Sequence, residues 1–432
     1  MQGNEASGEF RIDADFVGGN IVVHRVEADT VYLHQDPRDT PGFWFYWSFR
    51  VRGAQGRHLQ FQFTRGKAVG VRGPAVSRDQ GRSWEWLDDA SVTEESFAYT
   101  FASDDSDVRF CLAIPYQRAD LDAFLEKFAD RDDLVVEPHA TSRQGRSVVR
   151  FRFGCLDREP THRVLLTARH HACEMMASWV LEGTIESALN NPWLRQHVEF
   201  LCVPIVDTDG VANGDQGKNQ RPHDPNRDYQ GDAIYPEVAA LKQLLPTWSG
   251  SRLHLVLDMH CPYIRGGNNQ QVFFVGGPDE EMAKRLDQFC ILLEHAQVRP
   301  PTPHLETTAG ASHGQEERVA VDSDEAAQSP LPEATEEVSH GQERHAAAEC
   351  YGPALKYARE NNVPWGHSWN TLKEARSCAR WAATLPGVQL ATTLEIPYAD
   401  AGGQPVTVTS ARALGHDLAN ALTAWLQGLP PD

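Results

Sequence analysis

The chain has 432 residues, of which 41% are hydrophobic and 11 are tryptophan. This is enough apolar material for two or three domains with buried cores, and it excludes global disorder. Lys and Arg number 40 and Asp and Glu number 60, which gives a formal net charge of −20. That sign excludes a general binder of nucleic acid or of anionic membranes, because both need clustered positive charge.

The negative charge is concentrated in one stretch. Residues 301–349 contain 11 acidic residues, 2 Arg, no Lys and no aromatic residue, so this stretch has a net charge of −9 and the rest of the chain about −11. Such a composition cannot bury enough apolar surface to offset the entropy lost on ordering. We therefore expect a disordered acidic insertion at 301–349.

Nothing in the sequence indicates export or a membrane span. The first ten residues lack the apolar core of a signal peptide, and no window holds 18 uninterrupted apolar residues. The eight cysteines are scattered without a CxxC pair, which is typical of reduced thiols. We expect a cytoplasmic protein, and its oligomeric state stays unknown.

The first predicted region is all β. Residues 42–51 form a dense aromatic run, and residues 58–64 alternate apolar and polar side chains. Glycine-containing turn signals separate such runs. This pattern predicts an N-terminal β-sandwich domain over residues 1–117, followed by a helix at 119–130.

From about residue 148, strand-like runs alternate with helical ones. The predicted strands are 163–168, 198–206, 253–258, 271–275 and 389–395. The predicted helices are 174–188, 235–245, 278–293, 372–382 and 411–426. The alternation predicts an α/β catalytic domain over residues 118–432 with a mixed, mostly parallel sheet, in which functional residues lie at the carboxyl ends of strands.

Four His-x-x-Glu pairs occur, and their contexts separate them. His24 and Glu27 lie in the β region, where residues three apart face opposite sides of a strand, and two pairs lie within 301–349. His171 and Glu174 directly follow the strand at 163–168 and begin a helix. An imidazole and a carboxylate at this corner can reach one zinc ion.

Three further candidates complete the chemistry, although each could also be structural. His260 follows the strand at 253–258 and could be the third zinc ligand or a core histidine. Glu395 ends the strand at 389–395 and could be a general base or an edge-strand charge. Residues 224–227 place Asn and Arg side by side, which suits a bound carboxylate or a solvated turn.

Taken together and in order, these residues resemble the M14 zinc carboxypeptidases. The motifs are His171-x-x-Glu174, Asp224-x-Asn226-Arg227, His260 and Glu395. Residues 15–20, 43–47 and 113–121 resemble the β-sandwich that precedes the catalytic domain in the cytosolic carboxypeptidases, the M14B branch. The resemblance covers nearly the whole chain apart from the insertion.

The resemblance implies a zinc carboxypeptidase-like fold and a role for each residue. His171, Glu174 and His260 would hold one Zn2+ per chain. Glu395 would deprotonate a zinc-activated water and pass the proton to the leaving amine.

The residues around Asn226 carry the other implied roles. Asn226 and Arg227 would hold the terminal carboxylate of the substrate, and Asp224 would orient His171. The arginine that polarises the scissile carbonyl in the family has no unambiguous counterpart here. Arg221 and Lys218 are both candidates, and we prefer Arg221.

The resemblance implies hydrolysis of C-terminal amino acids from peptides or protein tails, with glutamate as one candidate residue. A glutamate preference needs a cation in the pocket, which Arg376 and Arg380 could supply unless both are solvated charges. Two other functions stay open. One is a zinc amidohydrolase of the aspartoacylase or desuccinylase type, whose members lack the preceding β-sandwich, and the other is a catalytically silent peptide-binding protein.

Overall fold

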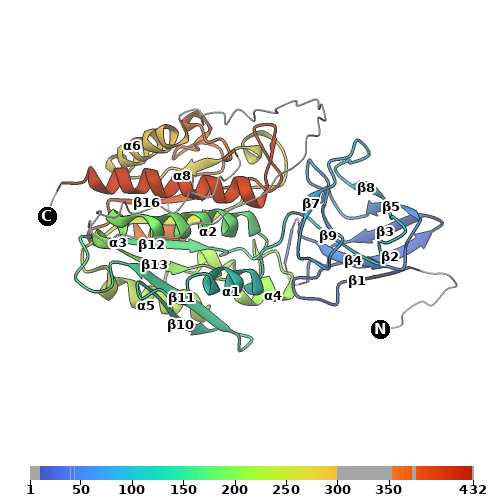
Figure 1. Ribbon diagram of the computed structural model, residues 1–432, viewed down its shortest axis with the longest axis horizontal. Helices are drawn as coiled ribbons and strands as arrows, with labels where there is room; N and C mark the ends of the chain where they lie inside the picture. The colour runs from blue at the N-terminus through green and yellow to red at the C-terminus, as the bar shows by residue number, and fades with distance from the viewer. Residues whose placement is uncertain (1–9, 39, 43, 299–352, 372–375, 431–432) are drawn as a thin grey trace, which may run out of the picture. The chain divides into compact units, whose positions relative to one another are not determined.

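The computed structural model describes residues 10–430 apart from 39, 43, 299–352 and 372–375 (Figure 1). The insertion predicted at 301–349 therefore lies outside the described residues. The described residues on both sides of it belong to one compact unit. No helix in this described part is long and apolar enough to cross a membrane.

The N-terminal region is rich in strands, as predicted, and they form two sheets. One sheet has the order β1 (Arg11–Asp13), β4 (Ser48–Arg52), β9 (Asp107–Cys111), β6 (Ala75–Ser77) and β7 (Glu85–Trp86). The other has the order β2 (Val22–Glu27), β3 (Thr30–His34), β5 (His58–Phe63) and β8 (Ser96–Thr100). Rings from both sheets meet in one core, where the centroids of Phe49 and Phe61 lie 5.4 Å apart. The sandwich assignment and its boundary at residue 117 stay predictions.

Only part of the aromatic run at 42–51 is a strand. β4 begins at Ser48, whereas Trp44 to Trp47 are buried in irregular backbone. Side chains supply the hydrogen bonds that a neighbouring strand would have supplied: Phe45 N donates to Gln216 Oε1 at 2.6 Å. The aromatic content of this run thus predicted its burial correctly, but it predicted the extent of the strand only in part.

A seven-stranded mixed sheet forms the centre of the second region. Its order is β10 (Leu134–Thr141), β11 (Ser147–Gly154), β13 (Val198–Val203), β12 (His162–Ala168), β14 (Leu253–His260), β16 (Leu390–Glu395) and β15 (Phe273–Val275). The four strands β13, β12, β14 and β16 are parallel neighbours. β10, β11 and β15 pair antiparallel at the two sides, so the sheet is mixed and only its centre is parallel.

Helices cover both faces of this sheet. The described α-helices are α1 (Arg118–Glu126), α2 (Met175–Asn190), α3 (Pro192–His197), α4 (Thr208–Asn213), α5 (Pro236–Ser249), α6 (Glu280–Gln297), α7 (Cys378–Ala382) and α8 (Val408–Gln427). Apolar residues of α2, α6 and α8 share one core with the sheet, and those of α5 and α7 share another. Of the helix predicted at 372–382, only Cys378–Ala382 is helical in the described part, and residues 372–375 lie outside it.

Helices α2 and α8 lie side by side (Figure 1) and touch through their backbones. A Cβ atom added at Gly183 of α2 would lie 2.0 Å from Arg412 O, and one added at Gly415 of α8 would lie 2.1 Å from Val180 O. Only glycine permits this approach. The contact fixes the position of α2 along the sheet.

Candidate functional site

Three adjacent strands deliver the candidate residues to one edge of the sheet. β14 ends at His260 and β16 ends at Glu395, and these two residues are register partners. β12 ends at Ala168 and leads through a short loop to His171. Glu174 is the N-cap of α2, so a sheet edge and a helix start hold the cluster.

The predicted zinc ligands lie within contact of one another. His171 Nδ1 is 2.9 Å from Glu174 Oε1, and His260 Nδ1 is 2.7 Å from Glu174 Oε2. The two Nδ1 atoms are 3.3 Å apart. All three side chains are buried, and two imidazole nitrogens with one carboxylate are a common donor set of catalytic zinc sites. The donor atoms therefore fit a metal ion.

The second nitrogen of each imidazole faces a carboxylate. His260 Nε2 lies 2.8 Å from Asp258 Oδ2, and His171 Nε2 lies 3.6 Å from Asp224 Oδ2, a distance of an ion pair rather than a hydrogen bond. Carboxylates in this position fix the tautomer of a ligating histidine. Sequence analysis missed Asp258, although a residue two positions before His260 on a strand shares its face.

Glu395 is buried and lines a cavity beside these residues. Its side chain is 8% exposed, and its Oε2 is buried without a hydrogen-bond partner. Burial raises the pKa of Glu395, whereas the nearby His260 and Lys218 oppose that rise. Burial would also raise the pKa of Glu174, but His171 and Lys218 hold it well below its usual range. Of the two carboxyl groups, Glu174 is the one in direct contact with Lys218 and with both imidazoles.

A cavity of about 110 Å3 opens beside this cluster. Its lining combines the cluster with three arginines and consists of His171, Asn226, Arg227, His260, Val275, Trp369, Asn370, Arg376, Ser377, Arg380, Thr393 and Glu395. Asn226 and Arg227 lie in a short 3-10 helix at Pro225–Arg227. Asn226 Oδ1 accepts a hydrogen bond from Cys378 N at 2.8 Å, which ties this turn to α7.

The structure separates the two candidates for the carbonyl-polarising cation. Arg221 is exposed, and neither Arg221 nor Lys218 is among the residues that line the cavity. Lys218 Nζ lies 2.8 Å from Glu174 Oε1 and donates to Cys261 O at 2.7 Å. The structure therefore places Lys218 in contact with the predicted zinc ligand Glu174, whereas Arg221, the residue that we preferred, is exposed.

Sequence comparison relates the chain to cytosolic carboxypeptidases. No protein-family model matches. Human cytosolic carboxypeptidase 1 is 36% identical over 120 residues, which are 26% of this chain and 10% of that protein. An uncharacterized protein of Zymomonas mobilis is 26% identical over 265 residues, which are 58% of this chain and 67% of that protein. The chain thus matches only about a tenth of the length of the human relative.

Structure comparison relates almost the whole chain to bacterial enzymes. A metallo-carboxypeptidase from Burkholderia cenocepacia has a TM-score of 0.72 at 17% identity, covering 97% of this chain and 99% of that one. A metallo-carboxypeptidase from Pseudomonas aeruginosa, in complex with (2-guanidinoethylmercapto)succinic acid, has a TM-score of 0.69 at 19% identity, covering 96% and 99%. The chain thus has the fold of these metallo-carboxypeptidases, and together with the sequence matches this supports its resemblance to the M14 family and to the cytosolic carboxypeptidases.

Proposed function

We propose that this protein is a zinc-dependent carboxypeptidase that hydrolyses the last peptide bond of peptides or protein tails. The observation that supports it best is the meeting of His171, Glu174 and His260 beside Glu395, from three neighbouring strands. The arginine-lined cavity next to them suits a substrate that ends in a carboxylate.

The residues divide the chemistry among them. His171 Nδ1, the Glu174 carboxylate and His260 Nδ1 would hold the metal ion. A bound Zn2+ would lower the pKa of water and polarise a carbonyl oxygen. Glu395 Oε2 would take the proton of the attacking water and deliver it to the nitrogen of the leaving residue.

Residues in and beside the cavity would bind the substrate. Arg227, with Asn226 beside it, would hold the terminal carboxylate through charged hydrogen bonds. We propose Lys218, in place of Arg221, as the cation next to the scissile carbonyl, because its ammonium group lies at the cluster.

We further propose an acidic C-terminal residue, with glutamate as the first candidate. Arg227, Arg376 and Arg380 line one small cavity of a strongly acidic chain. Arg380 is held in place, because its guanidinium lies 4.3 Å from the Trp365 ring centroid and donates to Asn370 Oδ1. Arg227 would hold the terminal carboxylate, and Arg380 on the same cavity lining would contact an acidic side chain.

A panel of peptides that differ in their last residue, each assayed with and without a chelator, tests this function. We expect chelator-sensitive release of a single C-terminal amino acid, fastest for glutamate. Cleavage confined to N-acyl amino acids would instead support the amidohydrolase, and tight binding without turnover would support the silent peptide-binding protein.

Replacing Arg380 should alter the choice of substrate. Charged hydrogen bonds contribute about 1.5–3 kcal/mol, so Arg380→Gln should lower kcat/KM for peptides ending in glutamate by about 10- to 100-fold. Peptides ending in leucine should be affected much less. Arg25→Gln, on the exposed strand β2, is the control. Equal losses for both peptides would argue against Arg380 as the selectivity residue.

Lys218→Gln and Arg221→Gln separate the two candidate cations. Removing one donor that stabilises developing charge costs about 100- to 1000-fold in kcat, and we expect this loss for Lys218→Gln. Steady-state kinetics on the best peptide would measure both variants. A large loss in Arg221→Gln with little change in Lys218→Gln would restore Arg221 to that role.

A further inference from the structure

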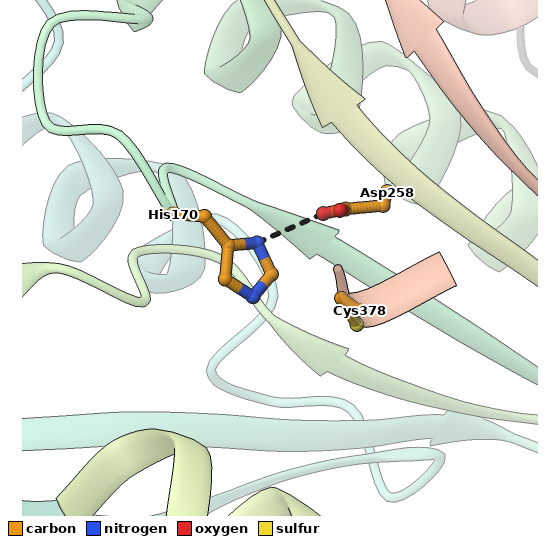
Figure 2. Close-up of side chains that lie close together, drawn as sticks. All are labelled: His170, Asp258 and Cys378. Atoms are coloured by element: carbon orange, nitrogen blue, oxygen red, sulfur yellow. Dashed lines mark ion pairs between the residues drawn. The ribbon is translucent and has the colours of Figure 1, made fainter. Parts of the chain in front are cut away.

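Asp258 is the meeting point of a buried network behind the proposed metal centre. Its Oδ2 lies 2.8 Å from His260 Nε2, and its Oδ1 accepts a hydrogen bond from Thr167 Oγ1 at 2.8 Å. Asn226 Nδ2 donates to Oδ2 at 3.3 Å. His170 Nδ1 lies 2.9 Å from Oδ1 (Figure 2). Both carboxylate oxygens are therefore engaged.

The network continues from His170 to helix α7. His170 Nε2 lies 2.7 Å from the hydroxyl of Tyr229, which can donate to it. The Tyr229 ring contacts Trp381 of α7 with centroids 5.5 Å apart, and Tyr229 N donates to Arg376 O at 3.2 Å. A continuous set of contacts thus joins the ring of His260 to the segment that carries Arg376 and Arg380.

Figure 2 shows that His170, Asp258 and Cys378 also lie close enough together to suggest a second metal site. One observation favours the network instead. The Asp258 oxygens already contact four side chains in the described structure.

We propose that His170 is a positioning residue for the metal centre. It holds Asp258, which faces His260 Nε2 and so leaves His260 Nδ1 free to bind a metal ion. This inference rests on the proposed function, because it needs His260 to be a metal ligand. In this proposal, His170 would touch neither the metal ion nor the substrate and would contribute to metal affinity through Asp258.

The test compares two replacements of the same histidine. His170→Leu fills the space without a donor, whereas His170→Asn keeps a donor close to the position of Nδ1. Loss of such outer contacts lowers metal affinity by about 10- to 100-fold. We expect that weakening for His170→Leu, measured by zinc competition against a chelator, and retention within about threefold for His170→Asn.

A structural effect and a positioning effect give different readouts. The visible spectrum of the cobalt-substituted protein reports ligand geometry, and we expect His170→Leu to shift it and His170→Asn to preserve it. His254→Asn is the control, because His254 is buried on the same strand β14 but contacts His162 at the opposite end. It should change neither affinity nor spectrum.

The outcomes are distinguishable from failure of the proposed function. A wild-type protein without any bound zinc would overturn the carboxypeptidase proposal and this inference with it. Stoichiometric zinc in the wild type with unchanged affinity in a folded His170→Leu variant would overturn this inference alone. Two zinc ions per chain, one of them lost in Cys378→Ser, would also overturn it.

A second variant tests the network if His170→Leu fails to fold. Tyr229→Phe removes only the hydroxyl at the far side of His170 and should weaken zinc affinity severalfold. An unchanged zinc affinity in Tyr229→Phe would count against the network.

Discussion

Glu395→Gln should abolish hydrolysis while leaving the metal in place. A general base contributes about 10²- to 10⁴-fold to rate, and the amide cannot accept the proton that the buried Oε2 of Glu395 is proposed to take. We expect kcat/KM on the best peptide to fall by about a thousandfold. Metal content should stay at one ion per chain, because Glu395 is not among the grouped donor atoms.

The pH profile of the wild type gives a second check on the same residue. Burial raises the pKa of Glu395, and a base works only when deprotonated. The rate should therefore fall as pH drops through that raised pKa, at a pH above the ordinary titration range of glutamate. Glu281→Gln, on the exposed part of α6, is the control. Retained activity in Glu395→Gln would remove this residue as the base.

His260→Ala and His171→Ala should each lose the metal. Each removes one of three protein donors, and a zinc ion held by two remaining ligands exchanges readily with solvent and chelators. We expect less than about a tenth of the wild-type zinc after dialysis, measured by elemental analysis, and no detectable hydrolysis. The loss follows from the three-ligand requirement of catalytic zinc sites.

The sequence offers a matched control for these variants. His24 and Glu27 form the same His-x-x-Glu pattern on β2, where both are exposed. His24→Ala should keep full metal content. Stoichiometric zinc in both His171→Ala and His260→Ala would contradict the ligand assignment.

The central strands, and the site residues at their ends, were predictable because the sequence patterns that indicate them are local. β12, β14 and β16 are buried on nearly every residue and are rich in apolar side chains, so their ends could be placed within a few residues. The hairpin of β10 and β11 was missed. Pro138 interrupts β10, which lies at the sheet edge where proline is tolerated.

The site residues that sequence reasoning did not place depend on tertiary contacts. Whether Lys218 or Arg221 faces the cluster is set by the loop between α4 and the 3-10 helix, which has no periodicity to read. The engagement of Asn226 by Cys378 joins residues 152 positions apart. Such pairings follow from the folded topology rather than from spacing along the chain.

The backbone contact between α2 and α8 has a consequence for how the activity can diversify. Gly183 lies nine residues after Glu174, about 13 Å along the helix at 1.5 Å per residue, so a side chain there would shift the helix that carries Glu174. Substitutions at Gly183 are therefore expected to disturb the position of Glu174. In contrast, Arg376, Ser377 and Arg380 line the cavity. Substitutions at residues 376–380 can therefore change which substrates bind without moving Glu174.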